Sequence, residues 1–134
     1  MVVRSSVHGY VQLTTWGQIA ADGLCIGHED VLVYEGDTAR FQTGSGTFAS
    51  RSVSVDGAGV HIAAGRIRDT MLKIAAHQLE APAAALEVVN GQFTVTGVHR
   101  RSVSFPQGVY SAHVPHAPPP VPEPGLEETP SAAP

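Results

Sequence analysis

GSGTFASRSVS, residues 44–54, is a loop rich in Gly, Ser and Thr that leads directly into a long apolar segment, residues 55–79. Glycine lets a backbone approach a ligand closely and take a positive φ, while Ser and Thr hydroxyls cap helices and donate to anions. A helix that begins here directs free N–H groups and the positive end of its dipole at whatever lies above the loop. The loop therefore predicts a site for an anionic cofactor, although its residues also suit an ordinary capped helix after a polar loop.

The segment that follows the loop has the period of an amphipathic helix. Its apolar residues recur three or four positions apart, as on one buried helical face: Val60, Ala63, Ala64, Ile67, Met71, Ile74, Ala75 and Leu79. Each glycine inside such a helix weakens it by roughly 1 kcal/mol relative to alanine. We therefore expect close packing against a neighbour or a ligand at Gly57, Gly59 and Gly65.

The residues before the loop predict a strand, a helix and a second strand. Val2 and Val3 indicate a short strand, and Val31–Tyr34 is β-branched and aromatic, as strands are. Between them, helical spacing of apolar residues predicts a helix from Thr14 to Leu24. We expect Thr14 or Thr15 to cap the start of this helix and Gly27 to help end it.

The residues after the long helix predict a β-hairpin and a short helix. Residues 86–95 place Asn90-Gly91 between apolar strands, and Asn-Gly favours a type I′ turn because both central residues take positive φ. Residues 101–105 indicate a further strand, and Pro106 can open a helical turn that reaches Tyr110 or Ala112.

The predicted fold class is α+β, with two helices, short strands and a β-hairpin. Residues 1–112 have the composition of a globular domain, whereas residues 113–134 are rich in proline and end with several glutamates. Such a tail cannot bury a core, so we expect it to be extended or disordered. It suits a spacer, and its proline run also suits an SH3-type groove.

Composition argues against several classes of function. The net charge is −4 and the sequence pI is about 5.9, with scattered basic residues, which argues against a nucleic-acid surface. No apolar run reaches the ~20 residues that span a bilayer, and the N-terminus has no apolar leader segment, so we expect a soluble, cytoplasmic chain. Cys25 is the single cysteine, which excludes an intramolecular disulfide and a cysteine metal cluster. We assign no catalytic residue and no metal ligand.

Three stretches of the sequence resemble one family in their order and spacing. They are residues 5–9 with 14–22, which read SSVHG and TTWGQIAAD, residues 29–38 with their Glu-Asp-Val and Gly-Asp-Thr ends, and residues 46–52, GTFASRS. The last is similar to a GT[YF]GSRS loop of the molybdenum hydroxylases, the family of xanthine dehydrogenase and aldehyde oxidase. The sequence is most similar to the molybdopterin-binding large subunit of aerobic carbon monoxide dehydrogenase. Residues 75–81 and 112–129 continue the resemblance, which covers nearly the whole chain but only part of such a subunit.

The resemblance implies a ligand for the loop. In this family the loop contacts molybdenum–molybdopterin cytosine dinucleotide near its pterin and molybdenum end. The corresponding cofactor-binding residues here are Thr47, Phe48, Ala49, Ser50, Arg51 and Ser52. The resemblance implies that backbone N–H groups and the hydroxyls of this loop donate to oxygens and phosphate of the cofactor.

The sequence also departs from the family. Tyr10 and Val11 stand where the family has Gln and Gly, the Gln being a cofactor contact, and Cys25 with Gly27-His28 replaces a Gly-x-Pro-Pro turn. The family's catalytic glutamate lies in a later segment, and the cysteine loop of carbon monoxide dehydrogenases in an earlier one. Neither segment is present, so we expect no activity from this chain alone.

Three hypotheses about function follow. The chain is a partial subunit that binds the cofactor together with the remaining segments or subunits of a molybdenum hydroxylase, which in this family include iron–sulfur and FAD subunits. Alternatively, it is a catalytically inactive, degenerate remnant, or a small protein-interaction module that uses its proline-rich tail. Because so few elements leave apolar surface uncovered, we expect a homo-oligomer or marginal stability when the chain is alone.

Overall fold

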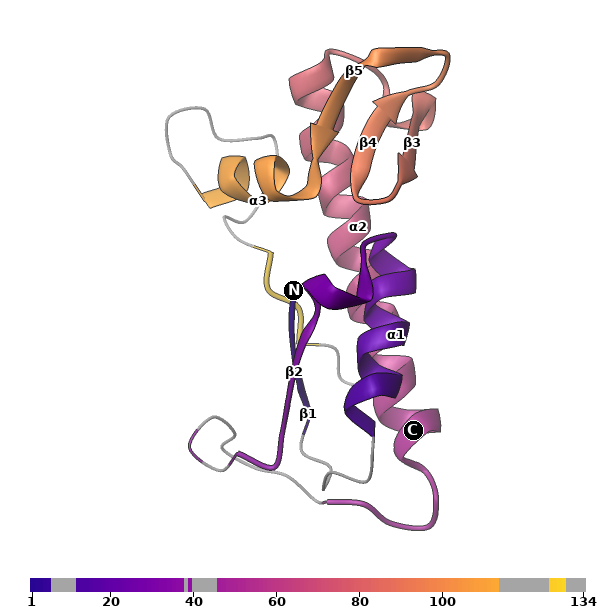
Figure 1. Cartoon of the computed structure of the whole chain (residues 1–134), viewed down its shortest axis with the longest axis vertical. Coiled ribbons are helices and arrows are strands. Elements are labelled where there is room, and N and C mark those ends of the chain that lie inside the picture. Colours follow the sequence, from indigo (N-terminus) through magenta and orange to yellow (C-terminus); the bar gives the residue numbers. More distant parts are fainter. Residues whose placement is uncertain (6–11, 38, 40–45, 114–125, 130–134) are drawn as a thin grey trace. The chain divides into compact units, whose positions relative to one another are not determined.

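A computed structural model describes residues 1–5, 12–37, 39, 46–113 and 126–129 of the chain (Figure 1). Contacts divide the chain into two compact units. The first holds the described parts of residues 1–23 and 27–64 with Thr129, and the second holds residues 24–26, 65–113 and 126–128. Each unit combines helix with sheet, which confirms the predicted α+β class. The predicted boundary between residues 112 and 113 stays a prediction, because most of the tail lies outside the described residues.

A strand–helix–strand motif forms the framework of the first unit. β1 (Val2–Ser5) and β2 (Leu32–Glu35) pair in parallel, with Val2 opposite Leu32 and Ser5 opposite Glu35. A parallel pair needs a crossover connection, and α1 (Gln12–Leu24) supplies it by running back alongside the sheet (Figure 1). Both predicted strands are thus confirmed, the second one residue later than expected.

α1 covers one face of this sheet and leaves the other uncovered by described residues. Val3 packs with Trp16 and Ala20 in a core bordered by Met1, Ile19, Val31, Val33 and Val60. On the opposite face, the cross-strand partners Val2 and Leu32 are about half exposed, at 49% and 53%. Parallel sheets are normally covered on both faces. The exposure of this apolar pair therefore agrees with the expectation that the chain leaves apolar surface uncovered. The oligomeric state itself stays a prediction.

The predicted ends of α1 are wrong in two respects. The helix begins at Gln12, so Thr14 and Thr15 lie inside it and do not cap it. At the other end Cys25 takes the left-handed conformation, with φ 56°, whereas Gly27 has φ −65°. A tertiary contact accounts for this, because the Cys25 carbonyl accepts a 2.6 Å hydrogen bond from the Gly91 N–H.

An antiparallel meander forms the sheet of the second unit. It runs β3 (Leu86–Val89), β4 (Gln92–Val95) and β5 (Val98–Ser104), in that order. Asn90 and Gly91 both have positive φ, 49° and 70°, which confirms the predicted hairpin turn. The predicted third strand is also confirmed, although it begins earlier.

α2 (Ala58–Leu79) provides the apolar face on which the second unit is built. Residues 65–79 of α2 belong to this unit, and Ile67, Met71 and Ile74 are buried on them, as their spacing predicts. Phe93 of β4 is fully buried and stacks on Phe105, with ring centroids 6.1 Å apart. The predicted helical face of residues 60–79 is thereby confirmed.

α3 (Phe105–His113) is the predicted helical turn around Pro106, and a capping box holds its start. The Ser104 N–H donates to Gln107 Oε1 at 2.9 Å, and the Gln107 N–H donates to Ser104 Oγ at 3.4 Å. This reciprocal pair satisfies two backbone donors at the helix start. The sequence signal for this capping box is a Ser three residues before a Gln.

The expected close packing at glycines holds at one position and fails at another. A Cβ on Gly57 would lie 3.1 Å from Trp16 and 3.2 Å from Ile19, so the turn just before α2, Val53–Gly57, packs closely on α1. A Cβ on Gly65 would have no heavy atom within 4 Å, so the expectation is wrong there.

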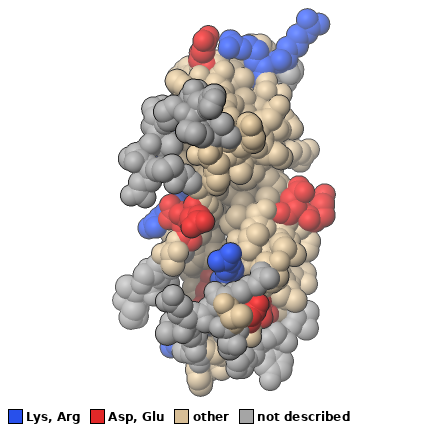
Figure 2. All heavy atoms as spheres, turned by 90° about the vertical axis from the view of Figure 1, so that its left-hand side faces the viewer, with Lys and Arg blue, Asp and Glu red and all other residues tan. Residues whose placement is uncertain are grey.

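Two surface properties bear on function. No helix in the described part of the chain is long and apolar enough to cross a membrane. On the face shown in Figure 2, Lys and Arg side chains lie at separate places among Asp and Glu.

Candidate functional site

Three parts of the first unit meet at the C-terminal end of its parallel sheet. β1 and β2 end there, α1 begins there, and loop 46–52 crosses the same end, at the bottom of the unit in Figure 1. In open α/β sheets, ligands bind outside the carboxyl ends of the strands. The fold thus brings the predicted loop to the end of the sheet where ligands are expected.

The loop has an unusual backbone. Ala49 and Ser50 are consecutive residues with positive φ, 48° and 54°, and Gly46 has φ 74°. Residues other than glycine rarely take this conformation, and such strain gathers at functional sites. Inside the loop, the Arg51 N–H donates to the Phe48 carbonyl at 3.1 Å.

The loop enters α2 without the side-chain cap that an ordinary helix start would have. A π-helical turn, Val53–Gly57, precedes α2, and Ser52 before it makes no side-chain capping bond. Ser54 Oγ instead donates to the Arg51 carbonyl at 2.9 Å. The alternative of a simple hydroxyl-capped helix therefore finds no support at Ser52.

Two hydroxyls of the loop are buried without a partner among the described residues. Ser52 is only 6% exposed and Thr47 is half-buried, and neither Ser52 Oγ nor Thr47 Oγ1 has a hydrogen-bond partner among the described residues. The other four predicted contacts, Phe48, Ala49, Ser50 and Arg51, are exposed. Leaving such a group unpaired costs about 1–3 kcal/mol, so each of the two hydroxyls calls for an explanation.

Sequence reasoning missed a second set of unpartnered atoms in the same unit. Gln12 Oε1, Trp16 Nε1 and both carboxylate oxygens of Glu35 are buried, and none has a hydrogen-bond partner within the described part of the chain. Within the part of the chain that the structure describes, these atoms and the two loop hydroxyls are the buried side-chain atoms of that kind, and all belong to the first unit. The strand–helix–strand order of the sequence is the signal that could have found this set, because it brings Glu35 and the start of α1 to the same end of the sheet.

Burial raises the pKa of Glu35 above its ordinary 4.5. The Trp16 indole N–H is near enough to the carboxylate to lower this pKa in part, but the two groups do not reach hydrogen-bonding geometry. Desolvation therefore has a larger effect on the pKa of Glu35 than the indole has, and folding disfavours the ionised form of this carboxylate.

The raised pKa of Glu35 predicts that folding weakens as the pH rises from about 4.5. The folded state then holds a proton that the unfolded chain has already released, so the free energy of unfolding falls until the folded pKa is passed. Urea unfolding of the wild type and Glu35→Gln between pH 4 and 7 measures this slope, which the variant should lose. Glu87→Gln, the same change at an exposed strand position, is the matched control. An identical slope in Glu35→Gln would contradict the prediction.

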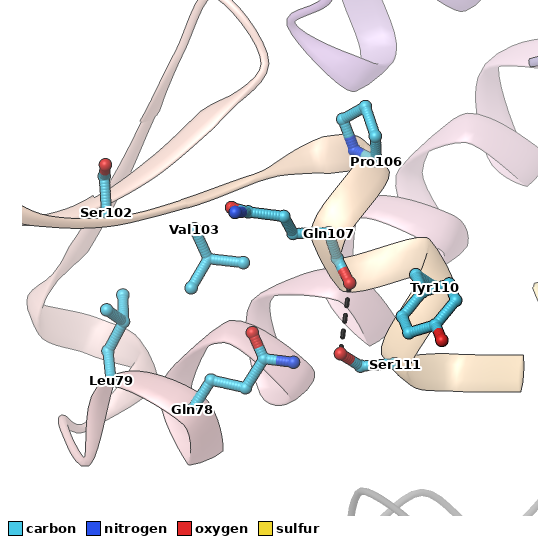
Figure 3. Close-up of a pocket in the computed structure, with 8 residues that line it drawn as sticks. All are labelled: Gln78, Leu79, Ser102, Val103, Pro106, Gln107, Tyr110 and Ser111. Carbon is cyan, nitrogen blue, oxygen red and sulfur yellow. Dashed lines mark hydrogen bonds between the residues drawn. The ribbon is translucent and has the colours of Figure 1, made fainter. Parts of the chain in front are cut away.

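The second unit has a shallow pocket of a different character. The end of α2, β5 and α3 line it with Gln78, Leu79, Ser102, Val103, Pro106, Gln107, Tyr110 and Ser111 (Figure 3). Ser111 Oγ donates to the Gln107 carbonyl at 3.1 Å. The described lining residues contribute amides, hydroxyls, including the phenol of Tyr110, and apolar groups.

The geometry of the first unit defines a class of protein. A strand–helix–strand unit with a strained Ser/Thr loop across the C-terminal ends of its strands has the form of the α/β units that bind ligands at that end of the sheet. Comparison with known proteins gives the family. The molybdopterin cofactor-binding domain family matches residues 3–132, and the chain belongs to it.

Known relatives agree with this assignment. The chain is 36% identical over 114 residues to the carbon monoxide dehydrogenase large chain of Afipia carboxidovorans and 40% identical over 114 residues to that of Hydrogenophaga pseudoflava. Each match covers 85% of this chain and 14% of the relative. A solved structure, reconstituted CO dehydrogenase from Oligotropha carboxidovorans, superposes with a TM-score of 0.79 at 33% identity, covering 93% of this chain and 16% of the other. The predicted family and its partial extent are thus confirmed.

Proposed function

We propose that this chain supplies loop 47–52 as one wall of a molybdenum–molybdopterin cytosine dinucleotide site in an oxidoreductase. The family assignment supports a molybdopterin cofactor, and the buried, unpartnered hydroxyls of Thr47 and Ser52 are the observation that carries the proposal. Hydroxyl groups both donate and accept hydrogen bonds, which suits the oxygens and phosphate of such a cofactor.

In this proposal each residue of the loop contacts the cofactor in a different way. Thr47 and Ser52 donate from the sheltered side, while exposed Phe48 covers the cofactor with apolar surface and exposed Arg51 offers a cation to its phosphate. The paired left-handed residues Ala49 and Ser50 hold this turn in shape. When bound, the cofactor supplies the redox-active molybdenum.

Further polypeptide completes the proposed enzyme. The chain spans 14% of the length of the curated relatives it matches. We therefore propose that it works with the remaining parts of a molybdenum hydroxylase, including iron–sulfur and FAD subunits, and is inactive alone. Tyr10 and Val11, which replace Gln and Gly of the family, lie outside the described residues.

Cofactor retention tests the loop directly. The chain is co-expressed with the products of its adjacent reading frames and purified, and molybdenum and pterin are measured per mole of chain. Removing one hydroxyl hydrogen bond costs about 1 kcal/mol, so Thr47→Val and Ser52→Ala should each lower affinity about fivefold and together about thirtyfold.

The matched control is Ser102→Ala, which removes an exposed hydroxyl in the second unit and should retain the wild-type cofactor content. Full retention by the double loop variant would contradict the proposed contacts. Wild-type protein that carries neither metal nor pterin and captures no partner would instead favour the degenerate remnant.

A further inference from the structure

The buried positions where the loop enters α2 begin with regular helical spacing. Gly57 packs on Trp16 and Ile19 of α1, and Val60 packs on the core around Trp16. Ala64, four residues further on, is fully buried. Intervals of three and four residues keep one side of an α-helix turned to the same neighbour. Gly57, Val60 and Ala64 therefore form the face that this part of the chain presents to α1.

The next buried position toward the loop breaks this spacing. Ser52 has helical backbone angles and is 6% exposed, yet it lies five residues before Gly57. Five residues is the hydrogen-bond spacing of a π-helix, and Val53–Gly57 is a π-helical turn. The α-helical spacing of four would instead bury Val53, which is 53% exposed. The π turn therefore places a hydroxyl, and not an apolar side chain, at the buried position.

Packing alone does not account for this choice. The π turn leaves Val53 in solvent and buries Ser52 Oγ, which has no hydrogen-bond partner among the described residues. An α-helical turn would bury the valine and rotate the serine away by about 100°, so it would remove both unfavourable terms. Single π turns inside helices are frequent at functional sites. A ligand that binds the Ser52 hydroxyl would explain why the chain keeps the π turn.

We propose that the π turn positions Ser52 for the cofactor, and that Gly57 is the positioning residue that sets the turn. The proposal rests on the proposed function, in which Ser52 donates to the cofactor. A Cβ on Gly57 would lie 3.1 Å from the Trp16 ring and 3.2 Å from the Ile19 side chain, so the missing side chain lets the end of the turn lie against α1. This contact fixes Gly57, and the spacing of five then fixes the direction of Ser52.

Thiol labelling measures the helical spacing without any cofactor. Ser52→Cys and Val53→Cys are made separately in the full chain, and peptide mass spectrometry separates each new thiol from Cys25. We expect the thiol at position 53 to react with iodoacetamide at least about tenfold faster than the thiol at position 52, because modification needs an accessible sulfur. An α-helical turn predicts the opposite order, so equal or reversed rates would overturn the proposal.

Cofactor retention tests the positioning role of Gly57. Ser52→Ala and Gly57→Ala are each co-expressed with the products of the adjacent reading frames, and molybdenum and pterin are measured over a series of dilutions. Each variant should bind the cofactor about fivefold more weakly, as the loss of one hydrogen bond predicts. Because Gly57 acts through Ser52, the double variant should also lose about fivefold, whereas independent effects would multiply to about twenty-five-fold.

The matched control is Gly65→Ala, which adds the same methyl group inside α2 with no heavy atom within 4 Å and should keep the wild-type cofactor content. A multiplied loss in the double variant, or wild-type retention by Gly57→Ala where Ser52→Ala loses cofactor, would overturn the positioning role. Full retention by Ser52→Ala would instead contradict the contact in the proposed function, even where the labelling rates confirm the π turn. Circular dichroism of each variant checks that the fold is retained.

Discussion

Replacing Trp16 with alanine is expected to lower the free energy of unfolding by about 3–5 kcal/mol, the usual loss when a large buried aromatic residue is truncated. Trp16 is fully buried and packs with Val3 and Ala20 between α1 and the parallel sheet. It also packs against the turn just before α2, where a Cβ on Gly57 would lie 3.1 Å from its ring. One side chain therefore joins the three elements that form the proposed site. Because small domains are stable by only about 5–15 kcal/mol, the alanine variant should lose most of its helical circular dichroism well below the melting temperature of the wild type.

One further variant separates packing from hydrogen bonding at Trp16, and a second serves as a control for the loss of an aromatic ring. Trp16→Phe keeps most of the aromatic volume and removes the unpartnered indole N–H, so it should change stability by less than about 1.5 kcal/mol. Tyr110→Ala removes a comparable ring that is 70% exposed, and it should change stability by less than about 0.5 kcal/mol. Urea unfolding followed by circular dichroism measures all three. A loss below 1 kcal/mol in Trp16→Ala would show that the first unit does not depend on this core.

The parts of the fold that local chemistry determines could be predicted from the sequence. The Asn90-Gly91 turn is correct because a type I′ turn needs positive φ at two adjacent positions. The buried face of residues 60–79 is correct because it follows the helical period over more than five turns. In both cases the signal lies within a few residues of the structure it determines.

Features that depend on distant residues could not be predicted in the same way. The left-handed residue after α1 is Cys25 and not a glycine, because the Gly91 N–H, far along the chain, binds its carbonyl. The parallel pairing of β1 with β2 is also non-local, and without it nothing places Glu35 beside the start of α1. The sequence therefore predicts the loop half of the candidate site, through Thr47 and Ser52, and not the buried polar atoms of Gln12, Trp16 and Glu35.

The resemblance and the structure contribute different parts of the functional argument. The resemblance selects residues 47–52, four of which are exposed and two sheltered. The structure adds that both sheltered hydroxyls lack partners among the described residues, and that acceptor oxygens on α1 and β2 lie at the same end of the sheet. A ligand with acceptors at one end and N–H donors at the other would satisfy both sets.

Gly23→Ala and Gly65→Ala are expected to change stability in opposite directions, although both add one methyl group to a helix. A Cβ on Gly23 would lie 2.7 Å from the Cβ of Ala64, so α1 and α2 touch there without room for a side chain. The Ala64 Cβ is attached directly to the backbone and cannot rotate away, so the helices must separate. We expect Gly23→Ala to lower the free energy of unfolding by about 1–3 kcal/mol, as overpacking does.

Gly65 lies inside α2 with no heavy atom within 4 Å of an added Cβ. Gly65→Ala should therefore raise the free energy of unfolding by about 0.5–1 kcal/mol, because alanine loses less backbone entropy than glycine in a helix. Thermal and urea unfolding of the two variants beside the wild type gives the sign of each change. Stabilisation by Gly23→Ala would show that the close contact between α1 and α2 is absent in solution. α1 carries Gln12 and Trp16, and the loop leads into α2. Stabilisation by Gly23→Ala would therefore also argue against the contact that holds these two halves of the candidate site together.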